Sequence, residues 1–117
     1  MKSKYYLKDK KISIYQEEEI SEPGEAPELR NVLVRGSAWA YVRQLSQREL
    51  YEAKAVGATE EMLFVINYLE GISVPNCNIV YNGRKYNVTR IDTFEGYRRD
   101  LTLYTSGGQT DDISGNA

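Results

Sequence analysis

The chain has 117 residues, one cysteine, no histidine and a formal net charge of −2 at pH 7. This length supports one ordinary hydrophobic core without a metal or a disulfide. Without histidine the commonest general base and the commonest metal ligand are missing, and one cysteine cannot form a thiolate zinc site. We therefore expect no cofactor, no metal site and no enzymatic activity, and the acidic balance argues against a general nucleic-acid binder.

Two further features concern location and partners. No apolar run approaches the ~20 residues that a membrane span requires, so we expect no membrane association. Cys77 can form no internal disulfide, which fits a reducing compartment such as the cytosol. Ten tyrosines, with lysines gathered near the N-terminus and glutamates after them, favour contacts between subunits, although a solvated surface is the simpler interpretation of any single charge.

The first third of the chain predicts one strand and one long loop. Residues 10–15, KKISIY, alternate polar and apolar, with Ile12 and Ile14 facing inward. Residues 16–29 are acidic, contain Pro23 and Pro27, and show neither helical nor strand periodicity. We expect a loop there, which is either a mobile linker or a partner-binding arm.

The middle of the chain changes from strand to helix. Residues 31–43 alternate as a strand that bends or bulges at Gly36. Ser46 and Glu49 have the spacing of a capping box, which predicts a helix over residues 47–56 that ends at Gly57.

The remaining strands follow at short intervals. Residues 59–69 are apolar on both faces, so both faces should be covered. Asn82-Gly83 between two apolar runs predicts a tight hairpin, with a bulge near Arg90, and Leu101 and Leu103 alternate with Thr102 and Tyr104 in the last strand. The chain is thus predicted to be mainly all-β, a small antiparallel β-barrel or sandwich with one short inserted helix, over residues 1–105, followed by a flexible tail over 106–117.

With the elements placed, the order of several short motifs resembles the phage head-tail joining family, also called head closure, stopper or head-tail adaptor proteins. Each motif is common by itself, but their shared order over residues 10–104 is distinctive. The motifs are Lys11-Ile12-Ser13-Ile14-Tyr15, Trp39-Ala40-Tyr41-Val42, Leu45-Ser46-Gln47-Arg48-Glu49 with Glu52-Ala53, Ile66-Asn67-Tyr68, Tyr81-Asn82-Gly83-Arg84-Lys85-Tyr86 and Arg99-Asp100-Leu101-Thr102-Leu103. Asn67 stands where the family pattern usually has arginine.

The resemblance implies a structural virion protein of a tailed bacteriophage. Such a protein forms a homo-oligomeric ring at the head-to-tail interface, near the packaged double-stranded DNA. It contacts portal or adaptor proteins and tail proteins, closes the DNA channel of the filled head, and offers a docking surface to the tail. Before assembly it would be found in the host cytoplasm.

Two sets of residues are candidates for these contacts. In the family the segment corresponding to residues 44–57 closes the channel, so it is a candidate for ring contacts, with the alternative that its helix only caps the barrel. Its candidate residues are Arg48, Glu49, Leu50, Tyr51, Glu52 and Lys54. The candidate partner interface comprises Trp39, Tyr81, Arg84 and Tyr86, although a core position is favoured for Trp39 and cross-strand packing is an equal alternative for the two tyrosines.

Two other functions remain as alternatives. A nucleic-acid-binding barrel would stack bases on aromatic strands and track phosphates with basic side chains. Its residues would be Tyr81, Arg84, Lys85, Tyr86, Arg98 and Arg99. An enzyme would have to use the carboxylates of Glu49, Glu52, Asp92 and Glu95, which without histidine or a metal motif are ordinary surface groups.

Overall fold

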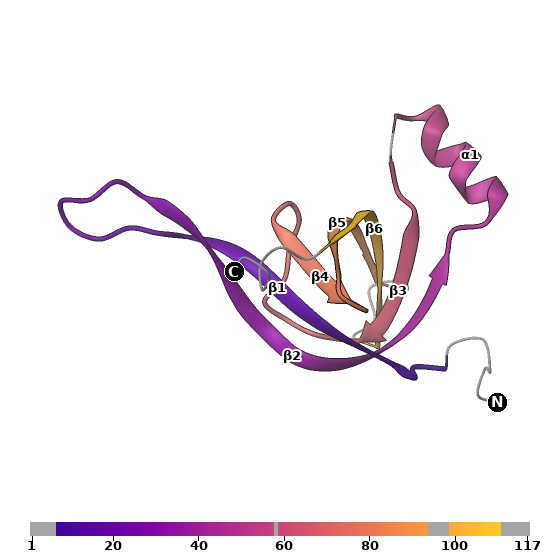
Figure 1. The fold of residues 1–117 in the computed structure, drawn as a ribbon, viewed down its shortest axis with the longest axis horizontal. Coiled ribbons are helices and arrows are strands. Elements are labelled where there is room, and N and C mark those ends of the chain that lie inside the picture. The colour runs from indigo at the N-terminus through magenta and orange to yellow at the C-terminus, as the bar shows by residue number, and fades with distance from the viewer. Residues whose placement is uncertain (1–6, 58, 94–98, 111–117) are drawn as a thin grey trace.

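The computed structural model describes residues 7–57, 59–93 and 99–110. These residues form a closed antiparallel barrel with the strand order β1-β2-β3-β6-β5-β4, from which one helix projects (Figure 1). The elements are β1 (Lys10–Ile20), β2 (Glu28–Gln44), α1 (Gln47–Ala55), β3 (Met62–Asn67), β4 (Cys77–Tyr81), β5 (Arg84–Thr93) and β6 (Asp100–Thr110). The prediction of an all-β fold with one short helix is confirmed, and of the two architectures the barrel is correct.

The barrel interior is filled by apolar side chains from every strand. Phe64 lies at its centre, fully buried, and its ring meets Tyr81 and Tyr86 edge to face at centroid distances of 5.8 and 5.4 Å. The other members of this core are Ile12, Ile14, Ala40, Ile66, Cys77, Ile79, Val88, Leu101 and Leu103. The inward positions predicted for Ile12 and Ile14 of β1 are therefore confirmed, and Leu101 and Leu103 of β6 are buried beside them. Burial raises the pKa of the Cys77 thiol to about 11.

Strand β3 is buried on both faces, as its sequence predicts. Phe64 and Ile66 face the barrel interior, whereas Leu63 and Val65 belong to a second apolar cluster with Leu45. This second cluster lies where the chain enters α1, so the outer face of β3 is covered by the segment that precedes the helix.

Local turn chemistry also agrees with the sequence. Asn82 and Gly83 both have positive φ, 55° and 77°, as a two-residue hairpin between β4 and β5 requires. The predicted bulge near Arg90 is present, because the β5–β6 register shifts between Val88 and Arg90. The bend at Gly36 is present too: five steps along β2, from Leu33 to Ala38, oppose only three along β1.

The prediction of a loop over residues 16–29 is wrong. β1 continues to Ile20 and pairs with β2 from Glu28 onward, so only residues 21–27 are a turn. Beyond the last β1–β4 pair, Gln16 with Cys77, this two-stranded ribbon leaves the barrel and projects from it (Figure 1). We call residues 17–31 the arm.

At the other end of the chain, β6 extends further than the sequence predicts. It pairs with β5 as far as Thr110, so the first five residues of the expected tail, 106–110, belong to the strand. Residues 111–117 lie outside the described part of the chain, so their predicted flexibility is untested.

The position of Phe64 gives a stability prediction. Because its ring is fully buried against two tyrosines, Phe64→Ala should lower the free energy of unfolding by about 3–5 kcal/mol. Tyr51→Ala, which truncates a side chain that is 75% exposed, should change it by less than about 0.5 kcal/mol. Urea unfolding followed by circular dichroism measures both, and equal effects would contradict the described core.

Candidate functional site at the projecting helix

Helix α1 begins with the capping box that the sequence predicts. The Glu49 amide donates to Ser46 Oγ at 3.2 Å, and the Ser46 amide donates to Glu49 Oε1 at 2.8 Å. The helix ends at Ala55, one residue earlier than expected, and Gly57 takes the left-handed conformation that follows it, with φ of 78°. Local chemistry therefore fixes both ends of a nine-residue helix.

An ion pair ties the first turn of α1 to the end of β2. Two nitrogens of the Arg43 guanidinium donate to the two Glu49 carboxylate oxygens at 2.8 and 3.0 Å. The Arg43 hydrogen bonds, together with the Ser46 amide, lower the pKa of Glu49 to about 2. Glu49, a candidate for ring contacts, is thus already engaged within its own chain.

The rest of the helix has little contact with the barrel. Leu50 packs on the cluster of Leu45, Leu63 and Val65, but no residue of α1 is fully buried. Tyr51 and Val56 are 75% and 80% exposed, the two most exposed large apolar side chains of the described residues. Figure 1 shows α1 standing off to one side of β3.

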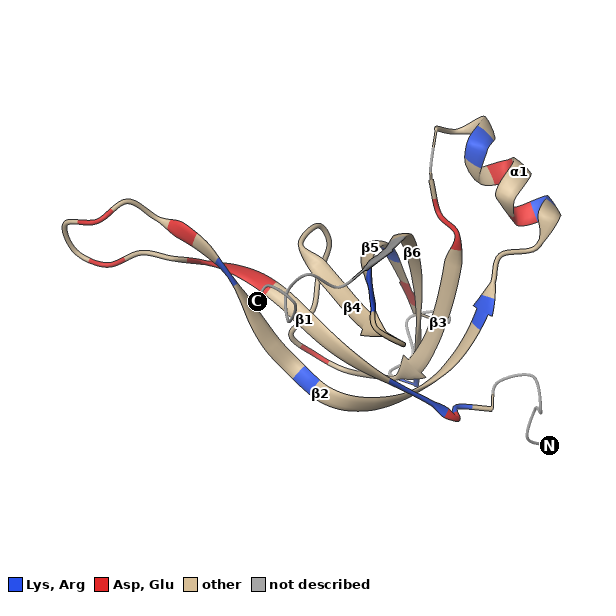
Figure 2. Ribbon diagram, viewed as in Figure 1, with Lys and Arg blue, Asp and Glu red and all other residues tan. Residues whose placement is uncertain are grey.

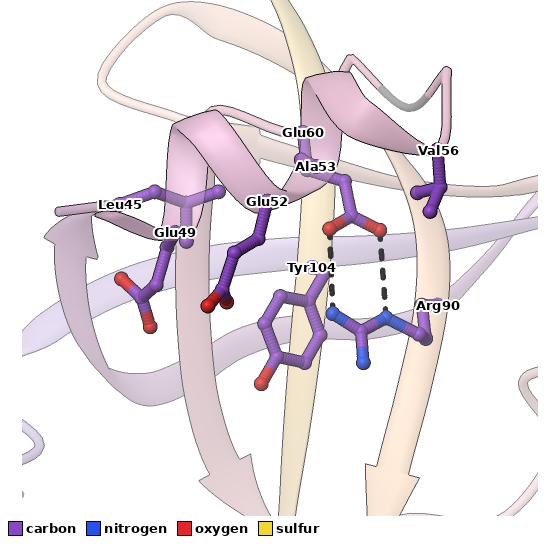
Figure 3. A pocket seen from close by; sticks show the side chains of 8 residues that line it. All are labelled: Leu45, Glu49, Glu52, Ala53, Val56, Glu60, Arg90 and Tyr104. Atoms are coloured by element: carbon purple, nitrogen blue, oxygen red, sulfur yellow. Dashed lines mark hydrogen bonds and ion pairs between the residues drawn. The ribbon is translucent and has the colours of Figure 1, made fainter. Parts of the chain in front are cut away.

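A hollow of about 510 Å³ separates α1 from the barrel wall (Figure 3). Its floor holds the ion pair of Glu60 and Arg90, whose closest atoms are 3.3 Å apart, and the Arg90 guanidinium lies 3.7 Å from the centre of the Tyr104 ring. Thr89 Oγ1 also donates to Glu60 at 3.0 Å, so this buried carboxylate is fully compensated. The hollow is therefore a gap beneath a loosely attached helix rather than a reactive site.

The carboxylates that an enzyme would use are all paired where the structure describes them. Glu49 pairs with Arg43, Glu52 with Arg48, and Asp92 with Arg90. Glu95 lies outside the described residues. Within the described ranges no three histidine, cysteine or carboxylate side chains group as a metal site would require. The described geometry offers no catalytic constellation.

Of the remaining candidate ring contacts, Glu52 lines the hollow beneath α1 (Figure 3). Arg48 Nε and Glu52 Oε2 are 3.3 Å apart and pair along the helix itself, at the i, i+4 spacing. Lys54 and Tyr51 are exposed. The segment thus presents a short helix with two acidic and two basic side chains and two exposed apolar ones.

The four candidate interface residues divide into two groups. Trp39 is 54% exposed and is covered only on one side by Lys11, whose Nζ lies 5.3 Å from its ring, so the core position favoured by the sequence is wrong. Arg84 is exposed as well. Tyr86 is 7% exposed and Tyr81 half-buried, both against Phe64, so these rings contribute to packing.

This burial also weakens the nucleic-acid alternative. A base-stacking platform needs exposed rings, and Tyr86 offers none. Of its basic residues, Arg84 and Arg99 are exposed and Lys85 is half-buried, whereas Arg98 lies outside the described residues.

Comparison with known proteins identifies the family. Residues 8–106 match the family model of the phage head completion protein. The chain belongs to the phage head completion protein family. A comparison with curated proteins finds no significant match, so the assignment rests on the family model. The match covers β1 to β5, α1, the arm and β6 as far as residue 106, and it confirms the head-tail joining resemblance read from the sequence motifs.

Membership of this family gives the protein a structural role in the phage head, in contact with other head and tail proteins of the virion. The family is structural rather than enzymatic. Among the described residues, no helix is long and apolar enough to cross a membrane.

The Arg43–Glu49 pair predicts a pH dependence. A carboxyl whose pKa falls from 4.5 to about 2 on folding stabilises the folded state above pH 4.5, and this contribution disappears as the pH falls through 2. Glu49→Gln keeps a capping-box side chain but removes the charge. We expect the variant to be less stable than wild type by about 1 kcal/mol at pH 7, with the gap closing between pH 4.5 and 2.

Urea unfolding at pH 7, 4 and 2.5 measures this difference. Because other carboxyls titrate equally in both proteins, the difference reports on Glu49. If the difference in unfolding free energy between the two proteins stays constant with pH, the charge of Glu49 contributes nothing to stability.

Proposed function

We propose that this head completion protein assembles as a ring at the head-to-tail interface, closes the DNA channel of the filled head and provides the surface on which the tail docks. The family match over residues 8–106 carries this proposal. Portal or adaptor proteins lie on one side of the ring and tail proteins on the other. The arm and α1 project from the barrel, and such projections suit contacts with neighbouring proteins (Figure 1).

The segment of residues 44–57 is proposed to close the channel. It is held at its N-terminal end by the capping box, by the Arg43–Glu49 pair and by Leu45, while Tyr51, Glu52, Lys54 and Ala55 further along α1 are exposed. A helix of nine residues is marginal without packing partners. Copies of α1 from neighbouring subunits, meeting near the ring axis, would supply that packing.

The side chains of α1 suit a plug made of protein. Arg48 and Lys54 balance Glu49 and Glu52, so the helix has no net charge and does not attract DNA phosphates. The exposed Tyr51 and Val56 are the apolar anchors for neighbouring copies. The hollow under α1 leaves room for the helix to change its tilt as the ring closes.

The first test removes the protein. Heads assembled without it should lose packaged DNA and remain without tails, and addition of the purified protein should restore both properties. Sedimentation and negative-stain imaging of the heads measure this. Heads that keep their DNA and acquire tails without the protein would contradict the proposed function.

The second test addresses the plug. Because Tyr51 and Val56 are exposed, Tyr51→Ser with Val56→Ser should leave the barrel folded, but we expect it to reduce the fraction of DNA-retaining heads roughly tenfold or more. Val74→Ser, which changes an exposed valine in the loop between β3 and β4, is the matched control and should retain DNA normally. Full retention by the double variant would remove α1 from the closing mechanism.

An exchange of Arg48 and Glu52 is a poor test of the same idea. These two side chains pair within one helix, so the exchanged pair would restore an intramolecular contact as readily as one between subunits.

A further inference from the structure

The outer face of the β1–β2 ribbon carries an apolar stripe that channel closure does not use. Leu29, Leu33 and Trp39 of β2 are 61%, 52% and 54% exposed. Across the ribbon they lie opposite Glu19, Tyr15 and Lys11. Side chains alternate along a strand, and Ile12 and Ile14 point into the barrel, so these odd-numbered residues of β1 and their partners share the outer face.

The ribbon is not supported by the rest of the barrel along most of its length. Among the described strands, β4 pairs with β1 only over 13–16, and β3 pairs with β2 only over 40–44. From the arm to Trp39, β2 therefore has a strand neighbour on one side only. A two-stranded ribbon is marginally stable in water by itself, and such edges and faces favour a partner.

The two ends of the ribbon carry opposite charge (Figure 2). Residues 17–30 contain six glutamates and one arginine, a net charge of −5. The opposite end of β1 is basic in sequence, with Lys8, Lys10 and Lys11 around Asp9. Lys8 pairs with Asp100 at 3.2 Å and Lys10 with Asp9 at 3.0 Å. We call this second region the root. The molecule is 54 Å in its longest dimension against 31 and 29 Å in the others, and the arm accounts for this elongation (Figure 1).

We propose that the arm of one subunit docks on the root of a second copy of this chain. This inference rests on the proposed ring. The acidic tip would meet Lys10 and Lys11 of the neighbour, while Leu29 and Leu33 cover apolar surface beside its exposed Trp39. A contact between two different patches at opposite ends of one molecule is heterologous, the kind that closes into a ring when its rotation allows. The apolar stripe supplies affinity and the charges supply orientation.

A simpler explanation of the same residues is protection of the strand edges. Glutamates and bulges prevent edge-to-edge aggregation in many sheets. The arm has the glutamates, and the two bulges lie just beyond it, between Ile12 and Tyr15 of β1. Edge protection predicts that no second copy of the chain lies against the arm. Detection of a contact at the arm therefore distinguishes the two explanations.

The test places a photo-crosslinker on the arm in assembled particles. p-Benzoylphenylalanine is introduced at Leu29 in the full chain, and at Asn87, an exposed position on barrel strand β5, as the matched control. Irradiation of purified virions should give a covalent dimer of this chain from position 29, joined to a peptide containing residues 8–11 of the second copy, with much less from position 87.

Exchange of charges then tests the pairing. Glu19→Lys with Glu22→Lys, or Lys10→Glu with Lys11→Glu, should each lower the dimer yield roughly fivefold or more, and the four changes together should restore it. Lys11 and Glu19 are eight residues apart on one strand, about 26 Å, so the restored pairs cannot lie within one chain.

The outcomes separate this inference from the proposed function. Virions that contain the protein, keep their DNA and yield only crosslinks to another head or tail protein, or none, would overturn the arm-to-root contact and leave channel closure standing. If the dimer yield does not recover in the variant with all four charge changes, the root is not the surface on which the arm docks. Absence of the protein from virions would overturn both proposals.

Discussion

The pairing of β2 is the constraint on which the rest of this structure depends. β2 has 17 residues, yet it closes the barrel against β3 through only five of them, Ala40 to Gln44. Everything before that segment is carried outward with β1 as the ribbon, and everything after it leads directly into α1. Both projections are therefore extensions of one strand at opposite ends of its short barrel segment, and the barrel holds them in a fixed relation (Figure 1). Two bulged positions near Gly36 bend β2 between its ribbon segment and the segment that pairs with β3.

Different physical terms stabilise the two parts. The barrel depends on burial: Phe64 and its neighbours exclude water from both faces of β3. The projections depend on polar contacts that are nearly all local, such as the Ser46–Glu49 box and the Arg43–Glu49 pair. Such contacts are individually modest, and exposed ion pairs contribute little. A rigid body with weakly held extensions suits a protein that must fold as a subunit and acquire its final contacts only when neighbours are present.

The sequence predicts the features that depend on neighbouring residues. The capping box of Ser46 and Glu49 spans four residues and the Asn82-Gly83 turn spans two, so a local sequence pattern identifies each of them. The apolar run 62–66 likewise shows that both faces of β3 are covered. The arm was inaccessible to this reasoning because Glu17 to Glu19 have low strand propensity and no alternation; their strand exists only through pairing with β2. Trp39 was misplaced because alternation shows which residues share a face but not which face is outward. The Glu60–Arg90 pair joins residues thirty positions apart, which no local pattern reveals.

The most direct test of the whole account is a cryo-electron microscopy reconstruction of the head-to-tail region of the mature virion. The account predicts a ring of these barrels between portal and tail, with α1 of each copy directed toward the channel axis and each arm lying against the next subunit. A reconstruction in which the barrel is absent from this region, or in which α1 points away from the channel, would contradict it.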